Sequence, residues 1–183
     1  MIYLIGGVSK TGKSFISRKL MESKNIPFFS TDFLLWSLGG EDGLFSYYDD
    51  DNKVAPILED YLMKILYFLN RNNQTYIIEG THVTISLIKK AISKYSENIR
   101  AVLLGYTNVT PLEKYEEIKK YESDETNKWY TLLSEEDFLA FLKRQQEKSV
   151  LLKEEAKKEN ILFFDVTDIR KEYVTIINSL IGM

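Results

Sequence analysis

The sequence predicts an α/β protein in which helices cover both faces of a parallel sheet. Short apolar runs alternate with segments of helical apolar periodicity, and the runs lie at residues 2–5, 27–29, 76–78, 101–104 and 161–164. Near-continuous apolar strands are typical of a sheet that is buried on both faces. A glycine-rich segment follows the first run and leads into a helix, at the sheet edge where such proteins bind ligands.

Composition favours a single domain over residues 1–183, because a chain of this length can bury a substantial core. The formal net charge of −3 does not suggest a surface for nucleic acid or for an anionic membrane. The absence of cysteine excludes disulfides and thiolate metal sites. The opening apolar run is too short for a signal peptide, and no run approaches the ~20 residues that cross a bilayer. We therefore expect a cytoplasmic monomer or homodimer.

Residues 7–14 match the phosphate-binding pattern G-x-x-x-x-G-K-[ST] through Gly7, Gly12, Lys13 and Ser14. Small residues let successive backbone N–H groups turn toward phosphate oxygens, and the following helix directs its positive end at the same anion. Lys13 would contact the β- and γ-phosphates, and the Ser14 hydroxyl would bind Mg²⁺. The alternative is a turn that only connects two core elements. The predicted nucleotide-binding residues are Gly7, Val8, Ser9, Lys10, Thr11, Gly12, Lys13, Ser14 and Phe15.

Apolar spacing places the helices between the strands. A helix is expected from residue 14, another from Pro56 to residue 69, and a third over 83–95. Both Pro56 and Pro111 are assigned to the first turn of a helix, where proline is favoured. Ser134 and Asp137 predict the N-terminal cap of a helix that runs to about residue 158. The last helix carries apolar residues from 173 to 180.

Two irregular segments interrupt this pattern. Residues 37–55 contain several glycines and a run of aspartates, and residues 123–133 are mostly polar. Long irregular segments in a compact domain are usually functional. We assign residues 37–75 to a substrate-binding subdomain and residues 123–145 to a lid-like segment.

Other motifs narrow the class of phosphate-loop protein. GTPases usually carry N-K-x-D, and the two Asn-Lys pairs, at residues 52–53 and 127–128, are not followed by this aspartate. Motor and ring ATPases usually have an acidic pair after an apolar strand. Here the run at residues 76–78 ends in a single acid followed by glycine, Glu79-Gly80.

Four signals make the chain resemble P-loop kinases of the nucleoside-monophosphate-kinase superfamily over nearly its whole length. They are the loop at 7–14, the strand end at 30–32, the strand end at 77–80, and a polar segment followed by a helix with Lys143 and Arg144. Shorter strings are similar to 2-phosphoglycerate kinases and to chloramphenicol-type phosphotransferases. The superfamily resemblance implies a three-layer P-loop NTPase fold with strand order 2-3-1-4-5. It also implies phosphoryl transfer from ATP, with Mg²⁺, to a small-molecule acceptor.

The chain departs from nucleoside monophosphate kinases in its arginines. Those kinases typically hold the acceptor phosphate with arginines of the substrate subdomain, and no arginine lies between Thr31 and Asn70. Since guanidinium groups are the usual means of gripping phosphate, we expect a neutral or weakly anionic acceptor that resembles a sugar, a nucleoside or an antibiotic. A nucleoside monophosphate kinase is the alternative enzyme. An ATP-binding regulator without useful turnover is the alternative of another class.

Residues after the predicted strands are the candidates for catalysis and substrate binding. Asp32 would orient or deprotonate the acceptor hydroxyl, or else cap the next helix. Glu79 would bind Mg²⁺ or the acceptor together with Gly80, or else be a polar strand end. His82, the only histidine, would contact the acceptor or simply begin a helix. Trp36 would stack on an acceptor ring or pack under a loop.

The lid-like segment supplies the candidates for neutralising charge on the transferred phosphoryl group. They are Lys128, Lys143 and Arg144, and Arg144 is preferred as a catalytic residue because guanidinium geometry suits phosphate. The alternative for all three is a solvated helix surface.

Overall fold

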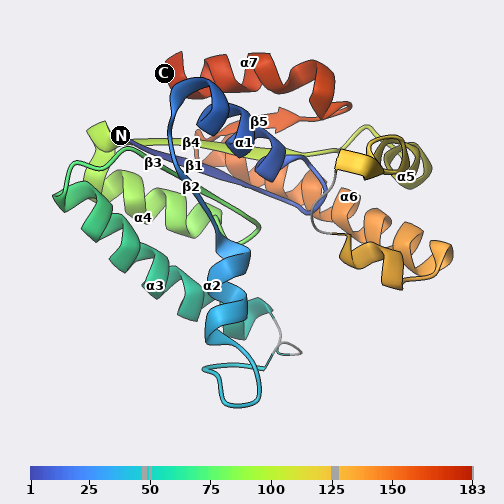
Figure 1. Cartoon of the computed structure of the whole chain (residues 1–183), viewed down its shortest axis with the longest axis horizontal. Helices are drawn as coiled ribbons and strands as arrows, with labels where there is room; N and C mark the ends of the chain where they lie inside the picture. Colours follow the sequence, from blue (N-terminus) through green and yellow to red (C-terminus); the bar gives the residue numbers. More distant parts are fainter. Residues whose placement is uncertain (47–48, 50, 125–127, 183) are drawn as a thin grey trace.

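The computed structural model describes the chain except for residues 47–48, 50, 125–127 and 183. Within that part, five strands form one parallel sheet in the order β2-β3-β1-β4-β5 (Figure 1). The strands are β1 (Ile2–Gly7), β2 (Phe28–Ser30), β3 (Tyr76–Glu79), β4 (Ile99–Gly105) and β5 (Leu162–Asp165). The predicted fold class and strand order are confirmed.

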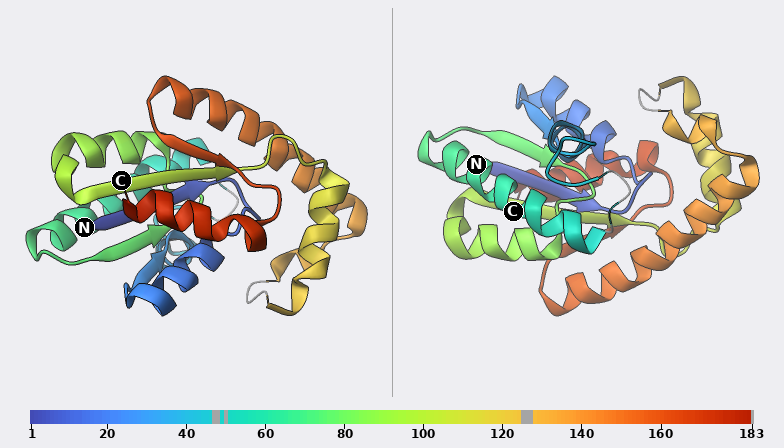
Figure 2. Two further views of the ribbon diagram at one scale, coloured as in Figure 1. Left: turned by 90° about the horizontal axis from the view of Figure 1, so that it is seen from above. Right: turned by 90° about the horizontal axis from the view of Figure 1, so that it is seen from below.

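Helices cover both faces of this sheet (Figure 2). The α-helices are α1 (Lys13–Lys24), α2 (Thr31–Leu38), α3 (Asp51–Arg71), α4 (Ile85–Tyr95), α5 (Pro111–Lys120), α6 (Glu135–Lys158) and α7 (Ile169–Gly182). Short 3₁₀ turns are η1 (Ser96–Asn98), η2 (Glu122–Asp124) and η3 (Trp129–Leu132). One core contains side chains of α1 and α7, and the other contains those of α3, α4 and the C-terminal half of α6. In the described part of the chain, no helix is both long and apolar enough to cross a membrane.

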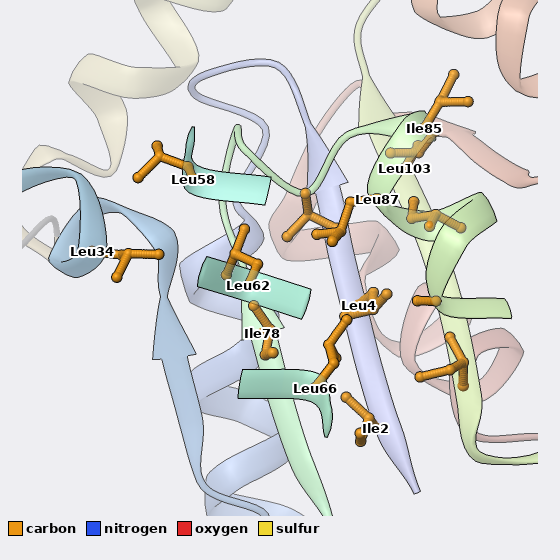
Figure 3. Close-up of a cluster of buried hydrophobic side chains, with 14 of the residues drawn as sticks. Ile2, Leu4, Leu34, Leu58, Leu62, Leu66, Ile78, Ile85, Leu87 and Leu103 are labelled. Carbon is orange, nitrogen blue, oxygen red and sulfur yellow. The ribbon is translucent and has the colours of Figure 1, made fainter. Parts of the chain in front are cut away.

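The apolar stripe of α3 forms much of the second core. Leu58, Leu62 and Leu66, four residues apart, lie over Leu4 of β1 and Ile78 of β3 (Figure 3), and all five side chains are fully buried. Burial of each such side chain contributes about 1.5–3 kcal/mol. The stripe therefore has a structural role and holds α3 against the sheet.

The prediction that Pro56 opens its helix is wrong, because α3 begins at Asp51 and Pro56 lies inside it. A proline in a helix removes one intrahelical hydrogen bond. Val54 and Leu58, four residues apart, are both buried, so the apolar stripe continues back beyond the proline. Packing of this extra turn against the core offsets the missing bond.

The predicted starts at Pro111 and Ser134 are confirmed. Pro111 is in the first turn of α5, where Thr110 and Glu113 form a capping box. The Asp137 N–H donates to the Ser134 hydroxyl over 3.1 Å at the start of α6. These caps fix the residues at which α5 and α6 begin, beyond the end of the sheet.

A third, smaller core joins α5, η3 and the beginning of α6. It consists of Ile118, Tyr130, Phe138 and Leu142, with Tyr115 and Phe141 packed against it. This group is separate from the two cores on the sheet, and Figure 2 shows α5 and the start of α6 projecting beyond the strand ends.

Candidate active site

The loop between β1 and α1 has the backbone of an anion-binding nest. Gly7, Lys10 and Gly12 have left-handed φ angles of 124°, 63° and 84°. A Cβ atom on Gly7 would lie 2.0 Å from the carbonyl oxygen of Leu104 in β4, so only glycine fits there. When left-handed and right-handed backbone conformations alternate in this way, successive N–H groups point to one side, where an anion binds.

Lys13 is buried at the start of α1, with 7 % of its surface exposed. Its Nζ donates a hydrogen bond to the Val8 carbonyl of the same loop, over 2.6 Å. Burial lowers the pKa of Lys13 from its ordinary 10.5 to about 8, although the charges of Glu79 and Asp32 counteract part of that effect. The ammonium group is still charged at neutral pH. A polyanion bound beside it would offset the free-energy cost of removing this charge from water.

Ser14 and Glu79 pair an oxygen of the loop with an oxygen of β3. The Ser14 hydroxyl donates to Glu79 Oε1 over 2.9 Å, and Glu79 is almost fully buried. Burial raises the Glu79 pKa, while the Lys13 charge and hydrogen bonds from Ser14 and Ser30 oppose the rise. No cluster of three or more His, Cys, Asp or Glu side chains that could hold a metal occurs among the described residues. The hydroxyl and carboxylate oxygens nevertheless fit Mg²⁺, which usually takes its remaining ligands from water and phosphate.

Helix α2 presents Asp32 to the same place. Ser30, not Asp32, is the N-cap of α2, since its side chain accepts from the Asp32 N–H. The Asp32 carboxylate is exposed and lines the nucleotide-side cavity described below. Trp36 follows one turn later and lines the neighbouring cavity. A single helix therefore reaches both spaces.

The smaller cavity, about 200 Å³, lies over the loop, and we call it the loop cavity. Of the predicted residues, it brings together Ser9, Lys10, Gly12, Lys13, Ser14, Phe15, Asp32, Glu79 and Gly80. Its lining also includes aromatic and cationic side chains: the Arg170 guanidinium lies 4.1 Å from the ring centre of Phe15 and 5.0 Å from that of Tyr121. Sequence reasoning missed Arg170 and Tyr121. The position of Arg170, shortly after β5, was the one available signal.

Asp165, at the end of β5, has a structural role. It accepts from the Thr107 N–H over 2.6 Å and pairs with Lys153 over 2.7 Å. These bonds join the loop after β4 to α6 and β5. The first residues after β5 that line the loop cavity are Ile169 and Arg170.

The larger cavity, about 760 Å³, adjoins the first, and we call it the side cavity. The predicted residues Trp36 and His82 line it, as do Gln145 and Lys148 of α6, which sequence reasoning missed. Ser9 and Thr81 line both cavities and mark their junction. No arginine is among the described residues that line the side cavity.

Arg144 lies outside both cavities and is exposed on α6, as is Lys143. Lys128 is exposed just before η3 and also lines neither cavity. The structure therefore does not bring these three cations to the loop. A helix projects successive residues about 100° apart, and it is Gln145, next to Arg144, that faces the cavity. The role assigned to Arg144 stays a prediction.

No protein-family model matches this sequence, and no curated protein matches it significantly. Solved structures resemble the whole fold. A shikimate kinase from Bacteroides thetaiotaomicron matches with TM-score 0.53 and 12 % identity, over 100 % of this chain and 99 % of that one. A sugar kinase from Janibacter matches with TM-score 0.58 and 15 % identity, over 99 % and 94 %. An uncharacterized protein from Eubacterium ventriosum matches with TM-score 0.58 and 15 % identity, over 100 % and 99 %.

These identities establish the fold and no more. The chain shares its fold with these solved kinases and has the predicted strand order β2-β3-β1-β4-β5, so the predicted fold is confirmed. Within that fold the chain has a phosphate-loop sequence, a left-handed nest and a buried lysine at the start of α1.

Proposed function

We propose that the protein is an ATP-dependent kinase that transfers the γ-phosphoryl group to a hydroxyl of a neutral or weakly anionic small molecule. The observation that carries the proposal is the junction at Ser9 and Thr81 between a cavity over a phosphate nest and a larger cavity. A phosphoryl group bound by the loop would there meet an acceptor bound next to it. The named kinases among the structural neighbours support a phosphotransferase.

The nucleotide would bind in the loop cavity. The loop amides and Lys13 would hold the phosphates, and the base would lie toward Tyr121 and Arg170. Ser14 and Glu79 would hold Mg²⁺, which neutralises charge on the phosphates when it is bound. A planar cation and a phenol ring give a base flat surfaces on which to stack.

Asp32 would serve as the general base. The acceptor oxygen forms a bond to the γ-phosphorus as the bond to the bridging β–γ oxygen breaks, and the acceptor proton passes to Asp32. The leaving group is ADP. The exposed carboxylate lies close enough to Lys13 to oppose the lowering of its pKa, so charge of both signs surrounds the reacting group.

The lining of the side cavity supports an acceptor without a phosphate group. Lys148 is the only lysine or arginine among the described lining residues, whereas Asp49 and Glu155 contribute carboxylates. A nucleoside monophosphate would place a dianion there with no guanidinium to receive it. Trp36 offers a flat apolar surface for a sugar or a base.

The segment at residues 123–145 would act as a lid. Its aromatic core is separate from the sheet, and Lys10 of the phosphate loop lies 4.0 Å from the ring centre of Tyr130. This cation–π contact would couple the lid to the occupied loop. Closure would exclude water and so limit hydrolysis of ATP.

Acceptor profiling tests the proposal. ADP release is measured with Mg·ATP and a panel of sugars, nucleosides, hydroxylated antibiotics and nucleoside monophosphates. We expect a neutral or weakly anionic compound to stimulate turnover, and Asp32→Asn to abolish it with little change in ATP affinity. Nucleoside monophosphates as by far the best acceptors would refute the acceptor class. Tight ATP binding without stimulation by any compound would favour the ATP-binding regulator.

A further inference from the structure

Gln145 connects the phosphate loop to the side cavity. It lies on α6 with 8 % of its surface exposed, and its Oε1 accepts from the Ser9 N–H over 3.2 Å. Gln145 also lines the side cavity, whereas Ser9 lines both cavities. The buried side-chain amide of Gln145 thus lies on the side-cavity side of the junction.

The hydrogen bond to Ser9 fixes which end of the amide is turned toward the loop. A backbone N–H only donates, so the Gln145 oxygen must face Ser9, and the nitrogen is directed elsewhere. Nε2 has no hydrogen-bond partner among the described residues, and it is not one of the fully enclosed polar atoms. Two N–H donors are therefore available to a ligand.

The turn of α6 that carries Gln145 is fixed to the end of the sheet. The Ser149 hydroxyl donates to the backbone carbonyl of Gln145 over 2.9 Å, and it accepts from the Tyr106 N–H over 3.1 Å. The adjacent Gln146 donates to the Val109 carbonyl over 2.8 Å. A side chain on such a support can position a ligand, because little motion remains to be frozen on binding.

We propose that Gln145 binds the acceptor and aligns it with the phosphate loop; this inference rests on the proposed kinase function. Nε2 donates to an acceptor oxygen next to the hydroxyl that is phosphorylated, while Oε1 keeps the Ser9 N–H. The acceptor class is thereby narrowed to compounds with a second oxygen function beside the reacting hydroxyl, such as 1,2-diols or 2-hydroxy acids. A neutral amide donor suits such an oxygen and provides no charge to bind a phosphate dianion.

Two substitutions distinguish the hydrogen bond from Ser9 to Oε1 from the proposed hydrogen bond from Nε2 to the acceptor. Gln145→Leu removes both, whereas Gln145→Glu retains an oxygen for Ser9 but loses the donors. Glu147→Gln, an exposed position on the same helix, is the matched control. With the better acceptor of D-ribose, a 1,2-diol, and D-gluconate, a 2-hydroxy acid, kcat/KM for the acceptor should fall about tenfold in both Gln145 variants. The KM for ATP should stay within about threefold, as expected if nucleotide contacts are intact.

Amide hydrogen exchange tests the link to the loop without any acceptor. The Ser9 N–H should exchange slowly in the wild type and in Gln145→Glu, and clearly faster in Gln145→Leu. Equal exchange in all three proteins would overturn the positioning role. A loss of kcat/KM in Gln145→Leu alone would overturn the donor role, since Gln145→Glu lacks that donor too.

Binding spectra distinguish this inference from the function on which it rests. With Mg·AMP-PNP bound, the same probes are titrated while the Trp36 indole N–H and the Gln145 side-chain NH₂ are followed by NMR. We expect at least one probe to shift both signals. A shift at Trp36 without one at Gln145 overturns the inference alone. No shift at Trp36 with any probe overturns the proposed acceptor cavity, and this inference with it.

Discussion

The hydroxyl of Ser14 donates a 2.9 Å hydrogen bond to the carboxylate of Glu79, which links the first turn of α1 to the end of β3. The two residues are 65 positions apart in the sequence, and parallel pairing of β1 with β3 brings them together. The paired oxygens are therefore a product of sheet order. They lie beside Lys13, whose charge opposes the rise in the Glu79 pKa.

Glu79→Gln should weaken nucleotide binding only in the presence of magnesium. The amide keeps the shape but removes the charge that would attract the metal, so we expect about a tenfold loss of Mg·ATP affinity. Affinity for ATP in EDTA should be unchanged or slightly higher, because a negative charge near the phosphates is gone. Titration calorimetry under both conditions measures the difference. Glu154→Gln, exposed on α6, is the control, and an equal loss in EDTA would contradict metal binding by Glu79.

Nucleotide affinity should decline as the pH rises above about 8. Burial lowers the Lys13 pKa to about 8, so the free protein gives up this proton through mildly alkaline pH. A bound triphosphate favours the ammonium form and raises the Lys13 pKa again. The nucleotide affinity is therefore at its maximum below pH 8 and decreases as the pH rises above 8. Calorimetry at pH 9 in two buffers of different ionisation enthalpy should reveal proton uptake on binding, with none at pH 6.5. Lys13→Met should bind weakly at every pH and show no such uptake. Uptake that persists in this variant would assign the proton elsewhere.

Gly80→Ala should destabilise the protein by about 2 kcal/mol or more. Gly80 has a φ of 146°, and a Cβ atom there would lie 1.8 Å from the Thr31 hydroxyl oxygen. Thermal or urea unfolding measures the loss. Gly182→Ala, where a new Cβ meets nothing within 4 Å, should change stability little.

A second substitution separates the two causes at Gly80. In the Gly80→Ala background, Thr31→Ala removes the opposing oxygen and should restore part of the stability, whereas the left-handed backbone strain remains. Full recovery would mean that the steric contact alone is responsible. No recovery would assign the effect to backbone conformation together with the remaining contact with the Cβ atom of residue 31, which would lie 2.9 Å away.

The two tryptophans should report separately on the two cavities. The chain contains only Trp36 and Trp129, and they line the side cavity and the loop cavity respectively. In Trp36→Phe, Mg·ATP should change the emission of Trp129. In Trp129→Phe, Mg·ATP should have little effect, whereas a productive acceptor should change the emission of Trp36. Responses in the opposite assignment would reverse the proposed roles of the cavities.

Most of the elements predicted from single strands and helices were correct because their signals are local. Alternating apolar runs and helical stripes indicated the layers, and the phosphate-loop spacing indicated the nest before any contact was known. The error at Pro56 arose where packing outweighed a local rule: the buried Val54 extends α3 one turn beyond the proline. Ser30 rather than Asp32 caps α2 because the helix begins at Thr31, so that the Ser30 side chain accepts from the Asp32 N–H.

Side-chain direction on the long helix α6 could not be obtained in this way. Arg144 and Gln145 are neighbours in sequence, and guanidinium chemistry favoured the arginine, yet Gln145 lines the cavity while Arg144 is exposed. Which of the two faces the loop depends on how α6 is rotated against the sheet. That rotation is set by hydrogen bonds of Gln146 and Ser149 to the segment after β4.

The sequence by itself determined the layers and the phosphate-loop spacing, and it singled out Lys13, Ser14, Asp32 and Glu79 as candidates, because these signals depend on residue type and on position after a predicted strand. Only the tertiary structure decided that two cavities share Ser9 and Thr81, that Arg170 and Tyr121 line the loop cavity, and that Gln145 lines the side cavity and accepts from the Ser9 N–H. These relationships join segments far apart in the chain. Their geometry follows from how helices pack on the sheet, and a linear pattern of residues does not contain that information.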